Sequence, residues 1–338
     1  MTEGLLVERI VPGASIQDRG RPGYLRFGVT NGGALDQYAL AEGQALLGNS
    51  HDAAALEMPG YGGRFIAKCT VNIALSGAEM DARLNDTPIG WRRSKTLRQG
   101  DVLEIGATRE GLIGYLHVEG GFLTPRMLGS RSSHLRAGFG FSPTSGDVLP
   151  IGPQSKGHGE VALPRPDYFD LRCLPLLKGP QTAHFTPETL EKFLRDQYSF
   201  SPRRDRMGAR MTPATGPLDG AADGLTIASD VINHGDIQIG GDGLPVLLMA
   251  DRGSSGGYPR IGVLARAALD AAAQMPSDEP FSFRLIDRST AVDLWKKHQA
   301  LINSLAGSVK PLHRDPRDIA DLLAYNLVDG MISAKENP

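Results

Sequence analysis

Short apolar runs alternate with polar, glycine-containing turns along most of the chain, and this pattern predicts many short strands. Residues 71–77 (VNIALSG) and 112–121 (LIGYLHVEGG) are rich in β-branched and aromatic residues, and each run closes at glycine. Residues 99–106 and 145–152 each place a Gly-Asp turn before a short alternating strand. Runs of this kind, bounded by turn residues, are typical of β-strands. We therefore expect the first half of the chain to be mainly β.

One helix with clear ends is predicted inside this strand-rich part, over residues 35–49 (LDQYALAEGQALLGN). Asp36 is suited to cap the first turn, because its carboxylate can accept hydrogen bonds from backbone N–H groups that have no partner inside the helix. Gly48 is suited to end the helix, because glycine readily adopts the left-handed conformation found after a last turn.

The second half repeats this arrangement of short strands with one or two helices. Strands are predicted in four runs, 171–179, 236–239, 244–251 and 281–287. A helix is predicted after Thr186, with Pro187 at its first position, and a second one over 260–274. Two halves built in the same way indicate a duplicated architecture.

Three regions are expected from these patterns: a domain over 1–155, a second over 165–290 and a helical tail over 291–338. Residues 153–167 are polar, rich in Pro and Gly and without periodicity, so we interpret them as a linker or an exposed crossover. In the tail, helices are predicted over 290–305 and 317–330. Their apolar faces dock either on this chain or on a partner.

Composition narrows the class of protein. The 338 residues include 42 Gly and 23 Pro, which excludes a helical bundle, and 41% are hydrophobic, which excludes general disorder. The net charge of −2 argues against a nucleic-acid binder. The 36 basic residues divide into 27 Arg and 9 Lys. Genome composition can produce this bias, so only arginines clustered with other polar groups carry weight.

The two cysteines, the N-terminus and the short apolar runs predict a cytoplasmic protein. Cys69 and Cys173 stand in apolar runs without metal-ligand spacing, so we expect buried free thiols in a reducing compartment. The N-terminus does not resemble a signal peptide, and no apolar run reaches the length of a membrane span.

Several common motifs are absent. The sequence has no phosphate-binding GxxxxGK[ST], no GxGxxG after a strand, no zinc-ligand pairing of histidines and no lysine motif of a biotin carrier. We assign no metal ligands. Residues 253–257 (GSSGG) match a nucleophile elbow, which would make Ser255 a nucleophile with His298 or His313 as its base. The chain lacks the alternating strand–helix pattern of that hydrolase fold, and a plain turn accounts for the match.

Polar clusters in glycine-containing turns carry the strongest chemical signal. Residues 17–21 (QDRGR) combine an amide, a carboxylate and two guanidinium groups, and residues 31–36 (NGGALD) place glycines before a helix. Similar clusters stand at 129–133, 205–210 and 251–260. Such turns can bind anions. Each one alone also fits a solvated turn or a capped helix.

These residues resemble the biotin-dependent carboxyltransferase-like family. The resemblance runs from about residue 5 to 290 and rests on the segments SIQDRGRPGYLRFGVTNGGALD, LLGN, ALE, LSGAEMDA, YLHVEGGF, LGSRSS, GPQTAHFT, SPRRDRMGAR, GDIQIGGDGLPVLLMADRGSSGGYPRIG and AQMPSDEPFSF. The family is also known as allophanate hydrolase subunit 2 or as the C subunit of 5-oxoprolinase. It includes the carboxyltransferase domain of urea amidolyase and the larger member of a bacterial kinase-inhibitor pair.

The resemblance implies a mainly β (α+β) fold with two cyclophilin-like β-barrel domains in tandem. It also implies a smaller partner, similar to allophanate hydrolase subunit 1, and in many bacteria a third subunit. The implied role is that of the C subunit of an ATP-dependent 5-oxoprolinase, an amide hydrolase that opens a cyclic amide. ATP with Mg²⁺ would be shared with the partner subunit.

Site residues are assigned to the turn clusters on this basis, because the reaction needs groups that hold phosphoryl and carboxylate oxygens. Candidate catalytic residues are Asp18, Arg21, Asp36, Arg131 and Tyr258. Candidate substrate-binding residues are Gln17, Gly33, Glu57, Ser132, Asp205, Arg206, Arg210, Gln238, Asp251, Gly257 and Arg260. Asp18, Asp36 and Asp251 could hold Mg²⁺ or accept a proton. Replacing Arg21 by Ala is expected to abolish activity without unfolding the protein.

Two other functions stay open. The chain could transfer a carboxyl group from biotin, carried on another protein, to urea or a related amide. It could also be a non-catalytic regulatory subunit that binds a sensor kinase, with the tail helices as its interaction surface. A biotin carrier protein distinguishes the first alternative, and kinase binding without nucleotide hydrolysis distinguishes the second.

Overall fold

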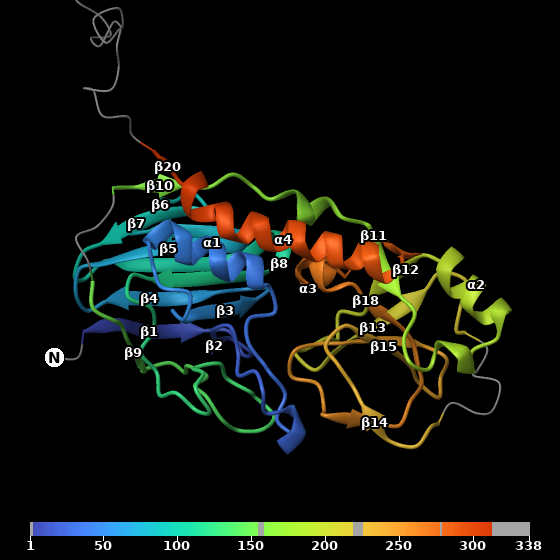
Figure 1. The fold of residues 1–338 in the computed structure, drawn as a ribbon. Coiled ribbons are helices and arrows are strands. Elements are labelled where there is room, and N and C mark those ends of the chain that lie inside the picture. Colours follow the sequence, from blue (N-terminus) through green and yellow to red (C-terminus); the bar gives the residue numbers. More distant parts are fainter. Residues whose placement is uncertain (1–2, 155–158, 219–225, 278, 313–338) are drawn as a thin grey trace, which may run out of the picture.

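The computed structural model describes residues 3–154, 159–218, 226–277 and 279–312. Two curled sheets lie side by side along the molecule, one built from the first half of the chain and the other from the second (Figure 1). The mainly β fold with two strand-rich units in tandem is thereby confirmed. No helix in these described ranges is long and apolar enough to cross a lipid bilayer.

In the described part of the chain, eleven strands form the first sheet, and all of their pairings are antiparallel. They are β1 (Gly4–Ile10), β2 (Ser15–Gln17), β3 (Ala55–Pro59), β4 (Gly63–Ala67), β5 (Val71–Leu84), β6 (Thr87–Pro88), β7 (Arg93–Leu97), β8 (Val102–Val118), β9 (Val148–Pro150), β10 (Val161–Ala162) and β20 (Lys310–Pro311). The main path runs β20-β10-β7-β5-β8-β4-β1-β9, with β3 paired to β8. The predicted strands at 99–106 and 112–121 belong to one strand, β8, which pairs with β5 along most of its length.

Seven strands form the second sheet, in the order β12-β13-β16-β15-β18-β11-β19. They are β11 (Cys173–Leu177), β12 (Tyr198–Phe200), β13 (Gly208–Pro213), β15 (Asp236–Ile239), β16 (Pro245–Leu248), β18 (Arg260–Leu264) and β19 (Ser282–Leu285). The pair β11–β19 is parallel, and the other named pairs are antiparallel. A separate ribbon joins β14 (Asp230–Val231) to β17 (Ser255–Gly256).

Within the described residues, four α-helices pack against the sheets: α1 (Gln37–Leu47), α2 (Pro187–Arg195), the largely buried α3 (Leu269–Gln274) and α4 (Arg288–Ser308). Short 3₁₀ turns are η1 (Leu25–Phe27), η2 (Asp167–Asp170), η3 (Thr182–His184) and η4 (Arg266–Ala268). The caps predicted for α1 and α2 are confirmed, since the Asp36 and Thr186 side chains accept hydrogen bonds from the backbone of the first turn. Gly48 adopts the left-handed conformation after α1.

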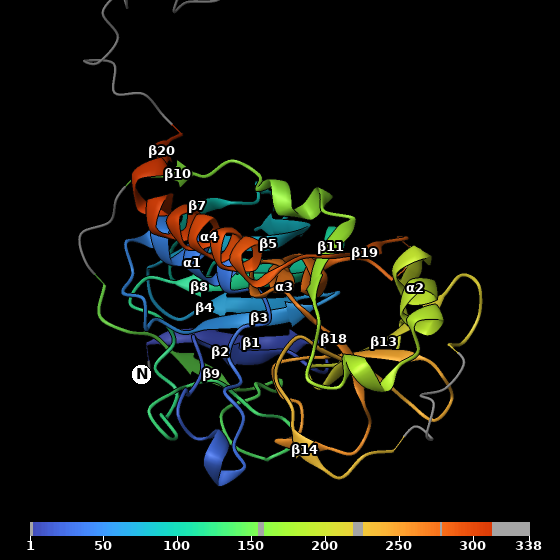
Figure 2. The same cartoon turned by 45° about the vertical axis from the view of Figure 1, so that its right-hand side comes forward.

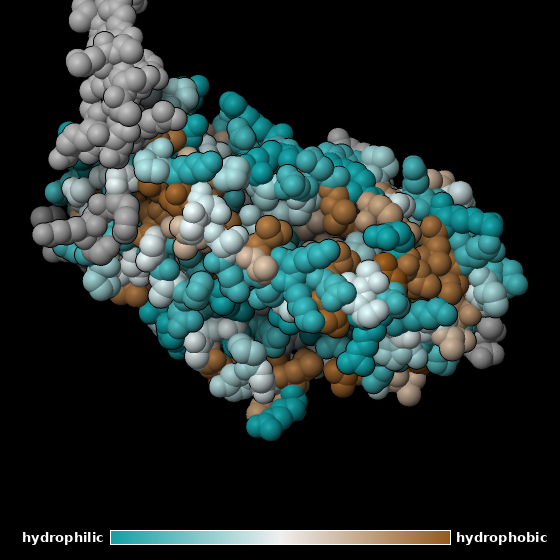
Figure 3. All heavy atoms as spheres, turned by 45° about the horizontal axis from the view of Figure 1, so that its top comes forward, coloured by the Kyte–Doolittle hydropathy of each residue, from teal (hydrophilic) through white to brown (hydrophobic). Residues whose placement is uncertain are grey.

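Helix α4 spans both halves of the molecule. It lies beside α1 over the first sheet and reaches η4 and β11 of the second half (Figure 2). Ile302 and Leu305 are buried on the inner face of α4, whereas Val292 and Leu301 are exposed. The face of the molecule that carries α4 is mainly hydrophilic, with small separate hydrophobic patches (Figure 3). The predicted helix over 290–305 is confirmed and docks on its own chain, while the one over 317–330 lies outside the described residues.

The predicted helix over 260–274 is wrong in its first part. Residues Arg260–Leu264 form β18, which pairs with both β15 and β11 near the centre of the second sheet. A Cβ on Gly262 would lie 2.7 Å from the Leu176 side chain, so the strand packs closely at that point. Only the alanine-rich end, Leu269–Gln274, is helical. Sheet pairing has overridden a local pattern that fits both structures.

Two further expectations need correction. Cys69 is half-buried and Cys173 is exposed, because Cys173 begins β11 and the inward positions belong to the leucines that follow; both thiols are free. The expected linker over 153–167 contains β10, which pairs with β7 and β20 of the first sheet. This segment is therefore partly built into the first sheet.

One side chain of α3 bonds directly to the first sheet. The Gln274 Oε1 accepts from the backbone N of Leu112 and Ile113 at 3.0 and 2.9 Å, and its Nε2 donates to the Ile113 carbonyl at 2.8 Å. The same Nε2 donates to Asp36 at 2.7 Å. The two halves therefore share buried hydrogen bonds in addition to apolar contacts.

We predict that Gln274→Leu lowers the free energy of unfolding by about 3 kcal/mol, because the backbone N–H groups of Leu112 and Ile113 lose their partner and the buried Asp36 carboxyl loses one of its donors. Gln154→Leu is the control, since Gln154 is exposed and makes one hydrogen bond. Chemical denaturation of both variants measures the difference. Equal stability of the two variants would contradict this account of the contact between the halves.

Candidate functional site

A buried guanidinium joins the two halves of the chain. Arg206 lies in the turn before β13 and is 7% exposed. Its Nε and Nη2 donate to the two carboxylate oxygens of Asp251 at 2.8 and 3.0 Å, and its Nη1 donates to Glu57 at 2.5 Å. Burial lowers the pKa of Arg206, but Glu57 and Asp251 more than offset this, so its pKa is raised. Arg206 is therefore a permanently charged bridge between β3 and the loop after β16.

Glu57 extends this contact to the start of α1. Its second carboxylate oxygen accepts hydrogen bonds from the Tyr115 hydroxyl at 2.7 Å and from the backbone N of Leu35 at 2.9 Å. The Tyr115 hydroxyl accepts from the backbone N of Asp36 at 3.0 Å. A continuous series of hydrogen bonds thus runs from the second sheet through β3 and β8 to the N-terminus of α1.

The buried carboxyl of Asp36 at the N-terminus of α1 accepts three hydrogen bonds. Its carboxyl accepts from the backbone N of Ala39 at 2.8 Å, the Tyr168 hydroxyl at 2.5 Å and the Gln274 amide at 2.7 Å. Burial, with the nearby charge of Asp270, raises the pKa of Asp36 well above its ordinary value. The geometry gives Asp36 a capping role and leaves it no direct access to solvent.

Two glycine-containing turns of the first half, residues 17–21 and 31–36, pack against each other beside Arg206. The backbone N of Arg21 donates to the Asn31 carbonyl at 2.7 Å. Gly33 has a φ of +90°, and a Cβ there would lie 2.9 Å from the backbone carbonyl of Arg19. The Gly33 carbonyl accepts from Nη2 of Arg206 at 2.7 Å. Gly33 is therefore required by backbone conformation and by close approach.

Hydrogen bonds of Asp18 connect the first of these turns to the loop around residues 127–133. Its carboxylate accepts from the hydroxyls of Ser130 and Ser132 at 2.6 and 2.5 Å, and from the backbone N of Gly20 and Arg131 at 2.8 and 2.7 Å. Four donors around one buried carboxylate are typical of a residue that fixes loop geometry.

Arg21 is packed into the same junction. It is 1% exposed, donates to the Ser132 carbonyl and lies over the Phe139 ring at 4.7 Å. Burial lowers its pKa, while Asp18 and Asp251 act in the opposite direction. The expectation that Arg21→Ala leaves the fold intact conflicts with this packing. Loss of activity in that variant would not by itself identify a catalytic role.

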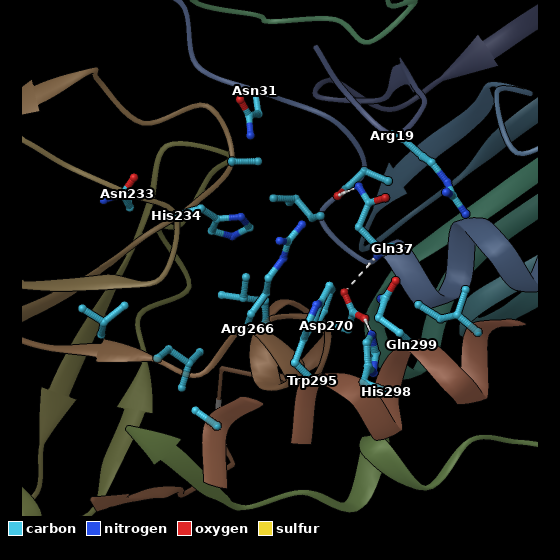
Figure 4. A pocket seen from close by; sticks show the side chains of 18 of the residues that line it. Arg19, Asn31, Gln37, Asn233, His234, Arg266, Asp270, Trp295, His298 and Gln299 are labelled. Carbon is cyan, nitrogen blue, oxygen red and sulfur yellow. Dashed lines mark hydrogen bonds and ion pairs between the residues drawn. The ribbon is translucent and has the colours of Figure 1, made fainter. Parts of the chain in front are cut away.

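A cleft of about 700 Å³ opens where the two halves and α4 meet. Figure 4 shows Asn31, Arg19 and Gln37 from the first half, His234 and Asn233 from the second, and Trp295, His298 and Gln299 from α4. The Arg266 side chain projects between these walls, and Asp270 lies beside His298 (Figure 4). A concave site between domains, with few polar groups converging, is a common arrangement for small ligands.

The cleft has an excess of positive charge. Four arginines line it, and within the described part of the chain none has a carboxylate oxygen within 4.0 Å: Arg19, Arg252, Arg266 and Arg288. Its one lining carboxylate, Asp270, accepts from the backbone N of Gln37 at 2.9 Å and lies 3.0 Å from Nε2 of His298. By contrast, the buried guanidiniums of Arg206 and Arg260 are fully paired with carboxylates.

None of the site residues predicted from the sequence lines this cleft, but several lie directly behind its wall. Gly32 forms part of the wall, and a Cβ on it would lie 3.1 Å from Nη1 of Arg21 and 3.5 Å from Oδ1 of Asp251. Gly33 and Asp36 each adjoin a lining residue in the sequence. The structure thus brings Asp18, Arg21, Glu57, Arg206 and Asp251 together as a supporting layer, and their catalytic or binding roles stay predictions.

Of the other predicted site residues, Ser132 and Arg131 bond to Asp18 of this layer, and the rest lie apart from it. Arg260 is buried and bonds to Gln181, Asp236 and Asp230, which fixes the β14 ribbon to β18. Gln238 donates to the backbone carbonyl of exposed Tyr258 at 3.3 Å. The remaining ones make local contacts: Gln17 with Ser15, Arg131 with Thr124, Ser132 with Asp18, Asp205 with its own turn, Arg210 with Asp242, and Gly257 with Ile227.

The Ser255 elbow is wrong. Ser255 lies in β17, which is followed by β18 and not by a helix, so the strand-to-helix turn of that motif is missing. His298 lines the cleft and pairs with Asp270, while His313 lies outside the described residues. The described residues contain no group of three or more His, Cys, Asp or Glu side chains placed to hold a metal ion.

The clusters that sequence reasoning singled out contain Arg19, Asn31 and Gly32, which line the cleft, but several other lining residues were missed. His234, Arg266, Asp270 and Trp295 come from separate elements, and none stands in a recognisable motif. The sequence partly indicates Arg252, which directly follows Asp251 in the cluster at 251–260.

Comparison with known proteins adds an independent finding. Residues 27–285 match the family model of the carboxyltransferase domain, subdomains A and B. The chain is 31% identical over 299 residues to the C subunit of 5-oxoprolinase from Haemophilus influenzae and 30% identical over 310 residues to that from Escherichia coli. Each match covers 86% of this chain and 94% of the relative. Urea amidolyase of Lachancea kluyveri is 30% identical over 335 residues, which are 90% of this chain but 18% of that protein.

Solved structures with the same fold agree with this result. Urea amidolyase of K. lactis superimposes with a TM-score of 0.80 at 24% identity, over 94% of this chain and 21% of that one. The protein TTHA0988 gives a TM-score of 0.74 at 28% identity, over 84% of this chain and 56% of that one. The chain therefore spans about a fifth and about half of these larger molecules.

We predict that Gly33→Ala destabilises the protein by about 3 kcal/mol or more and weakens any ligand bound in the cleft. Gly100→Ala is the matched control, because Gly100 has the same φ of +90° with no atom within 4 Å of its Cβ. That variant carries only the backbone strain, about 1–2 kcal/mol. Thermal unfolding of both variants checks the difference. An equal loss would show that the close packing of the two glycine turns is unimportant.

Proposed function

The chain belongs to the carboxyltransferase family of subdomains A and B, and from this premise we propose that it is the C subunit of an ATP-dependent 5-oxoprolinase. The proposal rests on the share of each relative's length that this chain matches. Matches to two 5-oxoprolinase C subunits extend over 94% of their length, whereas the match to urea amidolyase extends over 18%. Because these relatives are named as one subunit of an enzyme, partner subunits are implied, and we propose a smaller one similar to allophanate hydrolase subunit 1.

The cleft offers the groups that such a reaction needs. Opening a cyclic amide breaks its C–N bond, adds water to the carbonyl carbon and leaves a nitrogen that must take up a proton. His298 lines the cleft and is oriented by Asp270 at 3.0 Å, so we assign the proton transfer to this pair. The arginines that line the cleft favour the binding of a negatively charged substrate.

ATP with Mg²⁺, when bound, would make the amide carbonyl more reactive by phosphorylating its oxygen. Arg19 and Arg288, which also line the cleft without a carboxylate partner in the described part of the chain, suit phosphoryl oxygens. The carboxylates that Mg²⁺ would need are already engaged, since Asp18 accepts four hydrogen bonds, Asp36 caps α1 and Asp251 holds Arg206. We therefore propose that the partner subunit supplies the magnesium ligands, and we assign no step of this chain to the nucleotide.

The second candidate is carboxyl transfer from biotin, carried on another protein, to urea or a related amide. The family model and the match to urea amidolyase favour it. The same cleft would then hold the acceptor amide, with the arginines stabilising the negative oxygen that forms. The two functions differ in what they require: one consumes ATP with the cyclic amide, and the other needs a biotinylated protein.

The deciding experiment combines the purified chain with its smaller partner and third subunit, Mg²⁺, ATP and 5-oxoproline. We predict ADP and glutamate in equal amounts, and neither product when this chain is omitted. Carboxylation of urea by a biotinylated carrier, without glutamate, would favour the second candidate. Tight binding to a sensor kinase with no turnover of either substrate would contradict both and favour a regulatory subunit.

Variants of one residue then test where the chemistry takes place. His298→Asn should lower kcat by about 100-fold or more if His298 moves the proton. His184→Asn is the control, since His184 is exposed on η3 outside the cleft. Unchanged turnover in the His298 variant would remove this pair from the mechanism.

A further inference from the structure

Arg266 is the most central cation of the cleft and lacks a partner of opposite charge. Its guanidinium lies over the ring of Trp295, 4.3 Å from the centroid. Within the described residues it makes no hydrogen bond and has no carboxylate oxygen within 4.0 Å. Stacking on Trp295 fixes the plane of the guanidinium but leaves its N–H groups free, as in arginines that bind planar anions.

Arg252 forms the second cation on this wall and is much more deeply buried. It is 5% exposed, and its Nε donates to the carbonyl of Ile232 at 3.2 Å. Burial lowers its pKa, and Asp236 and Asp251 act against this without coming within 4.0 Å. A buried guanidinium without a direct counter-ion is unfavourable. An anion entering the cleft would supply the missing charge.

His234 completes the group. Its Nε2 is shielded from solvent and has no hydrogen-bond partner among the described residues. Burial, together with the charges of Arg252, Arg206 and Arg266, lowers the pKa of His234 to about 3, so the ring is neutral at physiological pH. A neutral ring can donate one N–H to an anion oxygen without adding a further charge to the site.

We propose that His234, Arg252 and Arg266 form a subsite that binds the carboxylate of the substrate, and this assignment rests on the proposed function. Two guanidinium groups and an imidazole suit the two oxygens of a small planar anion. Such a ligand would place its ring toward Trp295 and the Asp270–His298 pair. A magnesium-bound polyphosphate fits less well, because Asp270 is the one carboxylate in the lining and is already engaged.

The test compares 5-oxoproline with 2-pyrrolidinone, the same lactam without its carboxylate, and with inorganic phosphate. Calorimetric titration of the isolated chain measures binding without requiring turnover. We predict that Arg266→Ala weakens 5-oxoproline by about 10- to 100-fold and leaves 2-pyrrolidinone unchanged. Arg266→Lys, which keeps the charge but loses the fork, should lie in between. Arg284→Ala, on the exposed side of β19, is the control.

The outcomes separate this proposal from the proposed function. Unchanged 5-oxoproline binding in Arg266→Ala, or a loss that is equal for both lactams, would overturn the subsite. Phosphate binding that depends on Arg266 and does not compete with 5-oxoproline would overturn its assignment to a carboxylate. A third outcome is that the chain binds 5-oxoproline in a way that depends on Arg266, but its assembly with the partner subunits produces no glutamate. This result would refute the proposed function and retain the subsite. Thermal unfolding confirms that each variant is folded.

Discussion

The guanidinium of Arg206 lies where the two sheets and the glycine turns meet, and its contacts set their relative position. It bonds to Glu57 of the first sheet, to Asp251 of the second half and to the carbonyl of Gly33. A buried ion pair stabilises little in net terms, but breaking one by removing a partner is strongly destabilising. The bridge therefore fixes geometry more than it adds stability, and the shape of the cleft follows from that geometry.

The site is built in two layers as a consequence. The inner layer consists of buried charged residues. Arg206 pairs with Glu57 and Asp251, whereas Asp18 and Arg21 bond to hydroxyls and backbone groups of the loop around residues 127–133. The outer layer faces the cleft and contains arginines without partners, a neutral histidine and the Asp270–His298 pair. Gly32 separates them, with Arg21 and Asp251 directly behind it. Because the inner side chains are buried and bonded within the protein, the outer ones are the groups available to a ligand.

The sequence predicted local structure well where one residue decides the outcome. Asp36, Gly48 and Thr186 mark helix ends because capping depends only on neighbouring backbone groups. The segment 260–274 was wrong in part because the pairing of β18 with β15 and β11 depends on residues far away in the chain.

The same distinction applies to the candidate site. Clusters such as QDRGR and DRMGAR were visible, but no pattern could reveal that Asp18, Arg21 and Arg206 are buried and bond to distant parts of the chain. His234, Arg266 and Trp295 become neighbours only after α4 has docked across both halves. Family resemblance supplied the fold and the family, whereas the location of the cleft required the tertiary structure.

The most direct test of this account is a double-mutant cycle between Glu57 and Arg206, measured by equilibrium unfolding of Glu57→Gln, Arg206→Met and the double variant. If this contact holds the sheets together, the coupling free energy is about 2 kcal/mol or more. Each substitution then costs more stability in the wild-type protein than in the protein that already carries the other substitution. A coupling below about 0.5 kcal/mol would mean that the two changes act independently, and the bridge would not determine how the halves are joined.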